Sequence, residues 1–127
     1  MPLLNRLFQS NFGDCMKRIE AYIQIGRLEA VQEALDKEGI QGLSVEQVRG
    51  YGRQMGKTEV APKVKGPILL PKMKLEVIVP DSRLDVTLRA IIDSAKTGEI
   101  GDGKIFVSEI LDAIRIRTEE RGDAALE

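Results

Sequence analysis

The sequence predicts an α+β fold in which the order strand–helix–strand occurs twice. Two segments, Lys17–Ile25 and Lys72–Val79, alternate apolar and polar residues, as a strand with one buried face does. Each is followed by a stretch whose apolar residues recur at helical spacing, and then by a shorter segment that again suits a strand. Two such halves are typical of the ferredoxin-like (βαββαβ) arrangement, a sheet with both helices on one face.

In the first half, one face of the expected strand carries only apolar side chains, namely Ile19, Ala21, Ile23 and Ile25. The helix that follows has an apolar stripe of Leu28, Val31 and Leu35. Gly39 is expected to end that helix, because glycine readily adopts the left-handed conformation of a C-terminal cap. Ser44–Gly50 is expected to be the second strand, with Val45 as its most secure core position.

In the second half, the inner face of the expected strand carries Met73, Leu75, Val77 and Val79. Ile78 points to the opposite face, which the helices leave open, so we expect oligomerisation to cover that face. Pro80-Asp81-Ser82 turns the chain and offers an N-cap for the second helix. The stripe of that helix is formed by Leu84, Leu88, Ile91, Ile92 and Ala95. Lys104–Val107 is expected to be the fourth strand, and the tail after it is either a short helix or a strand.

The composition limits the chemistry of this 127-residue chain, which is long enough for one domain with a buried core. It has no His, which excludes Ser-His and Cys-His nucleophile pairs and the usual His-containing zinc sites. The single cysteine, Cys15, allows no intramolecular disulfide and favours a reducing compartment. No apolar run approaches the roughly 18–20 residues that span a bilayer. We therefore expect a small cytoplasmic protein without direct membrane insertion.

Residues 1–15 are expected to be an N-terminal extension of a domain that covers residues 16–127. The extension has apolar residues at helical spacing, but its apolar stretches are too short for a signal peptide. A frayed tail, a start codon upstream of the true start at Met16, and a short amphipathic docking helix are the alternatives.

Arg53–Pro71, between the second and third strands, is predicted to be one long flexible loop. Compact domains rarely contain loops beyond roughly 12–15 residues unless these are functional or disordered. From Arg49 to Lys74 there are seven basic residues and one acidic residue, a net charge of +6 that leaves −7 for the rest. The loop is either a solvated segment or one that attracts a phosphate ligand or an acidic protein surface. We expect no nucleic-acid partner, because Tyr51 is the only aromatic residue near this charge.

Thr97–Lys104, with the sequence TGEIGDGK, is the clearest local motif. Its glycines would let backbone N–H groups converge on a phosphate, and its lysine adds a positive charge. The motif nearly matches a Walker A loop, but Ile105 stands where that loop needs Ser or Thr. A plain tight turn is the alternative. Arg115 and Arg117 would share one face of a strand and could bind phosphate, or they could form surface ion pairs with Glu119 and Glu120.

Over residues 16–126 the sequence resembles the PII nitrogen-regulatory signal-transducer family. The motifs that support this are GIQG at 39–42, GYGRQ at 50–54, KTE at 57–59, LPK at 70–72, TGEIGDGKIFV at 97–107 and IRIRT at 114–118. Several long motifs in the family's order make the resemblance specific.

The resemblance implies a homotrimer that binds ATP or ADP in the three clefts between neighbouring subunits. The residues that would border the adenine and ribose are Gly42, Ser44, Glu76 and Ile78. The other nucleotide-binding residues, mainly on the phosphates, would be Gly52, Arg53, Gln54, Gly101, Asp102, Gly103, Lys104, Arg115 and Arg117. The resemblance also implies 2-oxoglutarate beside Mg-ATP, contacted by Gln54, Lys72 and Gly101, with Gln54 ligating the Mg²⁺. The long loop would be the T-loop, which changes shape with the ligand and contacts target proteins.

The sequence differs from the family in three places. Val60–Leu70 contains no Tyr and no Ser, so uridylylation of the usual T-loop tyrosine is not expected. Gln24-Ile25-Gly26 replaces a basic-Pro-Phe stretch, which suggests an altered effector or partner surface. Glu119 stands where a glycine usually follows the Arg-x-Arg-Thr motif.

We therefore expect a regulator, not an enzyme, that senses adenine nucleotides, with 2-oxoglutarate as a possible effector. Its typical target would be an ammonium transporter or an enzyme of nitrogen assimilation. A divergent sensor of energy or carbon status, with another effector and target, is the alternative. An enzyme that transfers phosphate, using Asp102 and Glu59 as acidic groups, is a third interpretation.

Overall fold

The computed structural model describes residues 15–40, 42–50 and 69–127. Its strands are β1 (Met16–Ile23), β2 (Ser44–Gly50), β3 (Leu70–Pro80) and β4 (Lys104–Ile110). Its α-helices are α2 (Leu28–Lys37) and α3 (Leu84–Ala95). Short 3₁₀ turns lie at η1 (Ile25–Arg27), η2 (Asp81–Arg83) and η3 (Gly122–Leu126). The predicted extension, residues 1–15, lies outside the described residues except for Cys15, as does most of the predicted long loop.

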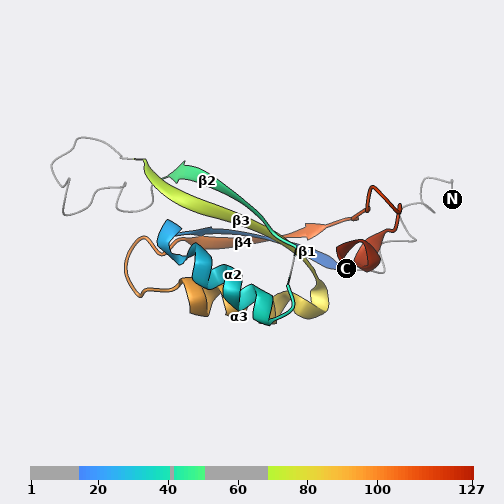
Figure 1. Cartoon of the computed structure of the whole chain (residues 1–127), viewed down its shortest axis with the longest axis horizontal. Helices are drawn as coiled ribbons and strands as arrows, with labels where there is room; N and C mark the ends of the chain where they lie inside the picture. Colours follow the sequence, from blue (N-terminus) through green and yellow to red (C-terminus); the bar gives the residue numbers. More distant parts are fainter. Residues whose placement is uncertain (1–14, 41, 51–68) are drawn as a thin grey trace.

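The four strands form one sheet in the order β2-β3-β1-β4, and each neighbouring pair is antiparallel. Both helices lie against the same face of this sheet (Figure 1). This arrangement confirms the ferredoxin-like fold that the alternation of apolar residues predicts.

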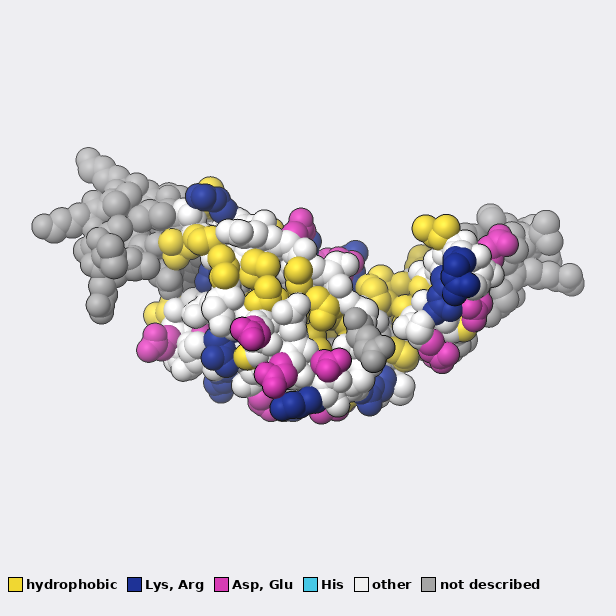
Figure 2. All heavy atoms as spheres, in the orientation of Figure 1, with side chains coloured by type: hydrophobic (Ala, Val, Ile, Leu, Met, Phe, Trp, Pro, Cys, Tyr) yellow, Lys and Arg dark blue, Asp and Glu magenta, His cyan; other side chains and the backbone are white. Residues whose placement is uncertain are grey.

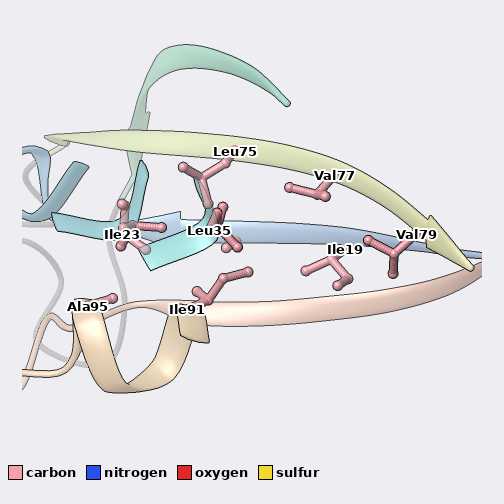
Figure 3. Packing of buried hydrophobic residues seen from close by; sticks show 10 residues of the cluster. Ile19, Ile23, Leu35, Leu75, Val77, Val79, Ile91 and Ala95 are labelled. Carbon is pink, nitrogen blue, oxygen red and sulfur yellow. The ribbon is translucent and has the colours of Figure 1, made fainter. Parts of the chain in front are cut away.

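The core lies between the sheet and the two helices (Figure 3). The sheet contributes the alternate residues of β1 and β3, and the helices contribute one stripe each: Ile19, Ala21, Ile23, Leu75, Val77, Val79, Val31, Leu35, Ile91 and Ala95. In the sheet Ile19 lies opposite Val77, so the two inner faces are in register. These residues are the ones that periodicity assigns to the interior.

The end of α2 also follows the prediction. Gly39 has a φ of 78°, the left-handed conformation that favours glycine. The Gly39 N–H donates to the Asp36 carbonyl, and the Ile40 N–H donates to the Leu35 carbonyl. This pair of hydrogen bonds is a Schellman motif, which satisfies carbonyl groups at the helix end.

Two predicted core positions are wrong. Val45 is 41% exposed, because β2 is an edge strand with a neighbouring strand on one side only. Ile25 is 42% exposed, because β1 stops at Ile23 and the chain turns into η1. In both cases the local pattern gives the polarity of the residue but does not show whether other parts of the fold cover it.

The predicted N-cap of the second helix is also wrong. Asp81 lies in η2, and α3 begins after it without any side-chain capping hydrogen bond. The Asp81 carboxylate instead pairs with the Lys17 ammonium at 2.8 Å. This hydrogen bond, supported by the charge of Glu109, raises the pKa of Lys17.

Two strands are longer than predicted. β3 starts at Leu70 and contains Pro71, because residues 70–80 pair with β2 or β1 over their whole length. Leu70 and Pro71 were expected in the loop. β4 continues from Val107 to Ile110, opposite Met16 of β1.

The sheet face opposite the helices is polar at its centre. Lys74 lies 4.0 Å from the Glu20 carboxylate and 3.5 Å from that of Glu46. The electrostatic interaction with Tyr22 is the main reason that the pKa of Lys74 is raised, and the charges of Glu20 and Glu46 raise it further. Tyr22 also meets Phe106 edge to face, with ring centroids 6.0 Å apart. Within the described residues, no helix is long and apolar enough to cross a membrane.

Candidate functional site

The glycine turn, which we define as residues 97–103, connects the end of α3 to β4. Gly103 has a φ of 103°, and a Cβ placed on it would lie 1.6 Å from the Tyr22 carbonyl oxygen. Only glycine fits there, because real Cβ atoms do not approach an oxygen so closely. The turn is thereby packed directly against the end of β1.

The Asp102 carboxylate holds the turn from inside. It accepts hydrogen bonds from the backbone N–H groups of Thr97 and Gly98, both at 2.9 Å, and from the Thr97 hydroxyl. The Gln24 side-chain amide lies 3.5 Å from the same carboxylate. The hydrogen bond from the Thr97 hydroxyl is the main reason that the pKa of Asp102 is lowered, and the two N–H groups and Lys72 lower it further.

The second connection to the turn comes from β3. The Lys72 ammonium donates a hydrogen bond of 2.7 Å to the Gly101 carbonyl. Lys72 and Gly101, both predicted to contact 2-oxoglutarate, are therefore in direct contact. Among the described residues, no acceptor is found for the N–H groups of Gly101 and Gly103, so both can donate to a ligand.

A cavity of about 300 Å³ lies beside the turn, between the end of α3 and strands β1 and β4. Its walls are formed by Tyr22, Ile23, Ile91, Ile92, Ala95, Lys96, Asp102, Gly103, Lys104 and Ile105. Two lysines and the glycine turn therefore border a mainly apolar hollow. This combination suits a ligand with an anionic part and an apolar part.

The predicted adenine and ribose residues form a separate group farther along the sheet. Ser44 lies opposite Glu76 in the pairing of β2 with β3. Ile78 follows on the same face, where it lies opposite Arg18 of β1. Gly42 comes two residues before Ser44, just ahead of β2. The fold thus brings this group together on the face that the helices leave open.

Arg115 and Arg117 lie in the C-terminal tail, which we define as residues 111–127. They were expected to share one face of a strand, but the described tail forms a tight turn closed by the Arg115 N–H on the Glu120 carbonyl. The Arg115 guanidinium donates to the Glu120 carboxylate at 2.7 Å and to the Ala124 carbonyl at 3.2 Å. The ion pair with Glu120, one of the two alternatives, is thus present for Arg115 in the single chain, and phosphate binding by Arg115 stays a prediction. Arg117 is exposed.

The two groups do not meet within one chain. Lys72 and Ile78 are six residues apart on β3, on the order of 20 Å in an extended strand. The glycine turn and the C-terminal tail lie at opposite ends of the sheet (Figure 1). Gly52, Arg53 and Gln54 fall outside the described residues. A single chain thus presents two incomplete halves of the predicted site.

Gln24 and Thr97 contact the Asp102 carboxylate, but neither was among the predicted binding residues. Gln24 is 78 positions from Asp102, so no local pattern could connect them. Thr97 lies in the predicted motif, but a hydroxyl that bonds within a turn has the same sequence signature as one that binds a ligand.

The tail turn contains a strained position that a substitution should relieve. Glu119 has a φ of 62°, which costs a residue with a Cβ about 1–2 kcal/mol. We expect Glu119→Gly to raise the free energy of unfolding, measured by urea denaturation, by about 0.5–1 kcal/mol. The control is Glu99→Gly, an exposed position without positive φ, which should lower stability slightly. The prediction would be contradicted if Glu119→Gly and Glu99→Gly changed the free energy of unfolding by the same amount.

The lowered pKa of Asp102 predicts how acid affects the glycine turn. The hydrogen bonds to its carboxylate stabilise the turn fully above the ordinary pKa, about 4, and are lost as the pH falls through the lowered folded-state value. An NMR titration of the Gly98 amide should therefore have a midpoint below pH 4. The Gly42 amide, outside the turn, is the control, and a midpoint for Gly98 at or above the ordinary value would contradict the assignment.

Comparison with known proteins shows the family to which this chain belongs. The family model described as Nitrogen regulatory protein P-II matches residues 16–120. The chain belongs to the P-II family. A P-II protein of Rhodobacter capsulatus is 50% identical over 112 residues, which cover 87% of this chain and 100% of the relative. P-II 1 of Escherichia coli K12 is 47% identical over the same share of both chains.

A solved structure supports the fold of this P-II family member. The crystal structure of Arabidopsis thaliana PII bound to citrate matches it with a TM-score of 0.74 and 38% identity. The match covers 87% of this chain and 92% of the plant chain. P-II proteins are nitrogen regulatory proteins, so this chain is a signal-transduction regulator of that kind.

Proposed function

We propose that this P-II protein is a cytoplasmic homotrimer that binds ATP or ADP between neighbouring subunits and regulates a target protein through the segment between β2 and β3. The observation that supports this most directly is the separation of the site into two halves. The glycine turn, directly before β4, lies at one end of a subunit, and the C-terminal tail, whose sequence contains Arg115 and Arg117, lies at the other (Figure 1). Such halves complete each other only across a heterologous contact, which in a closed ring repeats with each subunit.

Exposed apolar residues also support association. Figure 2 shows hydrophobic side chains gathered where the body of the molecule meets the C-terminal tail. Large hydrophobic residues of β4 and the tail are well exposed in the single chain: Phe106, Val107, Leu111, Ile114 and Ile116. Apolar surface of this kind is typically covered by a partner, because burial removes it from water.

The ligand chemistry follows from the glycine turn. The N–H groups of Gly101 and Gly103, which have no acceptor among the described residues, suit the oxygens of a di- or triphosphate, and Lys104 lies beside them in the sequence. We propose that 2-oxoglutarate, a dicarboxylate, joins Mg-ATP near Lys72 and Gly101, in agreement with a relative of known structure that is bound to citrate. Within the described residues no group of His, Cys, Asp or Glu could hold a metal, so the Mg²⁺ would come with the phosphates and meet Gln54.

The target would be an ammonium transporter or an enzyme of nitrogen assimilation. A sensor of energy status that does not respond to 2-oxoglutarate is a second candidate, favoured by the contact of the altered Gln24 with the glycine turn. Calorimetry with ATP, ADP and 2-oxoglutarate separates the two. Binding of 2-oxoglutarate that requires Mg-ATP supports the first, and nucleotide binding without it supports the second. No binding of either nucleotide at millimolar concentration would refute both.

A mixing experiment tests whether the site lies between subunits. Lys104→Ala and Arg117→Ala should each abolish nucleotide binding when present in all subunits. When the two variants are unfolded and refolded together at equal amounts, about one quarter of the contacts would pair an intact turn with an intact arginine. Binding of nucleotide to about a quarter of the sites is the expected result. A double variant refolded alone is the control, and a mixture without any recovered binding would contradict the intersubunit site.

The ion pair of Arg115 makes a further prediction. Its guanidinium donates to Glu120 at 2.7 Å, and this carboxylate would compete with a phosphate on a neighbouring subunit for the same donor. Because this pair is partly exposed and worth roughly 0.2–1 kcal/mol, Glu120→Gln should tighten ATP binding about threefold. Glu119→Gln removes the same charge without removing the ion pair and is the matched control. Equal effects of the two substitutions in calorimetry would show that only the net charge matters.

A further inference from the structure

We propose that Asp102 is the residue that positions the glycine turn for phosphate, with Thr97 and Gln24 as its supports, and that its carboxylate does not itself contact the phosphate. This inference rests on the proposed nucleotide site and assigns to Asp102 a role different from that of a phosphate ligand. Its partners are Thr97 and Gly98 at the start of the turn and Gln24, which directly follows β1.

The first step is electrostatic. Asp102 borders the cavity beside Lys104, where a free carboxylate would repel a phosphate through like charge. Its two oxygens are instead occupied by donors on its own chain, two N–H groups and the Thr97 hydroxyl, with the Gln24 amide as a longer contact. Hydrogen bonds to an ionised group are the stronger kind, so these donors hold the charge within the turn.

The second step concerns conformational entropy. The turn contains three glycines with positive φ, and a segment of this kind has many accessible conformations unless it is anchored. Asp102 connects the start of the turn to its end, and Gln24 connects it to the end of β1. Because the turn is ordered before a ligand arrives, binding does not have to supply that ordering free energy.

The third step shows why Asp102 is the central group. Lys72 holds the Gly101 carbonyl, and in a planar trans peptide the following N–H points the opposite way. The Lys72 contact therefore fixes the peptide that joins Gly101 to Asp102. The Asp102 carboxylate fixes the start of the turn, at Thr97 and Gly98. Removal of either contact frees one side. Asp102 is the central group because its carboxylate, near the end of the turn, bonds both to the Thr97–Gly98 segment and to Gln24, which directly follows β1.

The test uses Asp102→Asn, which keeps the size of the side chain but replaces one acceptor oxygen by a donor. We expect hydrogen exchange of the Thr97 and Gly98 amides to accelerate in the unliganded protein. The Kd for ATP and for ADP should both rise about tenfold, because the hydrogen bonds that order the turn are charge-assisted and therefore of the stronger kind. The Kd for adenosine, which has no phosphate, should stay unchanged, and the Tm should fall only slightly, because the lost hydrogen bonds are confined to the turn.

The matched control is Glu99→Gln, which removes a negative charge from the same turn; its side chain makes no hydrogen bond with the part of the chain that the structure describes. Unchanged or slightly tighter ATP binding is expected for it. Unchanged or tighter binding for Asp102→Asn as well would overturn the inference, since Asp102 would then act only as a repelling charge. A general loss of stability or of adenosine binding would also overturn it, because that outcome indicates damage to the whole fold.

A second pair of variants tests the support from Gln24. Gln24→Glu places a second carboxylate beside Asp102 and should weaken ATP binding in the wild-type background but not in Asp102→Asn. An equal effect in both backgrounds would overturn the role of Gln24. A wild-type protein that binds no nucleotide would refute the proposed function in its own titration. The exchange data would then indicate a purely structural contact, which overturns this inference too.

Discussion

Gly103→Ala is expected to lower the free energy of unfolding by about 3 kcal/mol and to abolish nucleotide binding. The new Cβ would lie 1.6 Å from the Tyr22 carbonyl oxygen and 2.7 Å from its carbonyl carbon. Since both are backbone atoms of β1, no side chain can move aside, and the pairing of β4 with β1 must shift. The left-handed φ of 103° adds about 1–2 kcal/mol of strain.

Substitutions at two other glycines separate the cost of the close contact from the cost of the left-handed backbone. Gly98 has a φ of 89° but open space around its added Cβ, so Gly98→Ala should cost about 1 kcal/mol from the backbone alone. Gly26 has open space and no positive φ, so Gly26→Ala should change stability by less than about 0.5 kcal/mol. Urea denaturation of the three variants gives the comparison. If Gly103→Ala lowered the free energy of unfolding no more than Gly98→Ala does, β1 and β4 would be able to move apart around the new Cβ at no measurable cost.

Ile19→Ala is expected to lower the free energy of unfolding by about 3 kcal/mol, within the range of roughly 2–5 kcal/mol for truncation of a buried aliphatic side chain. Ile19 is 0% exposed and lies on β1 opposite Val77 of β3 and Val107 of β4. The surrounding strands are hydrogen-bonded on both sides, so the cavity cannot collapse easily.

The graded control at the same position is Ile19→Val, for which we expect a cost of about 1 kcal/mol. Ile25→Ala, at a 42% exposed position outside β1, should cost less than Ile19→Ala. These values come from chemical denaturation at one protein concentration, because any association of subunits would make stability depend on concentration. Similar costs for Ile19→Ala and Ile25→Ala would contradict the observed end of β1.

Much of the fold could be predicted from local patterns. The alternation through Ile19, Val77 and their neighbours gives the inner face of the sheet, because side chains of a strand point to opposite faces in turn. Val45 has the same pattern but is exposed, because β2 lies at the edge of the sheet. Edge and centre differ only in the presence of a neighbouring strand, which a local pattern does not record.

The candidate site could be predicted as a set of residues but not as an arrangement. The glycine turn and Lys104 are recognisable because their residue types suit phosphate. The strand geometry expected for Arg115 and Arg117 is wrong, because Glu119 and Glu120 close the tail into a turn. The contact of Asp102 with Gln24 had no signal in the sequence, since the two are 78 positions apart.

The sequence by itself determined the order of strands and helices, the inner faces of β1 and β3, the Gly39 cap and the motifs of the P-II family. These depend on neighbours a few positions apart, whose geometry follows from the period of the helix or strand. The tertiary structure alone decided that Asp102 bonds within its own turn, that Lys72 meets Gly101, and that the glycine turn and the tail arginines lie at opposite ends of a subunit. These facts depend on how distant segments pack, and such packing minimises the free energy of the whole chain rather than that of any one segment.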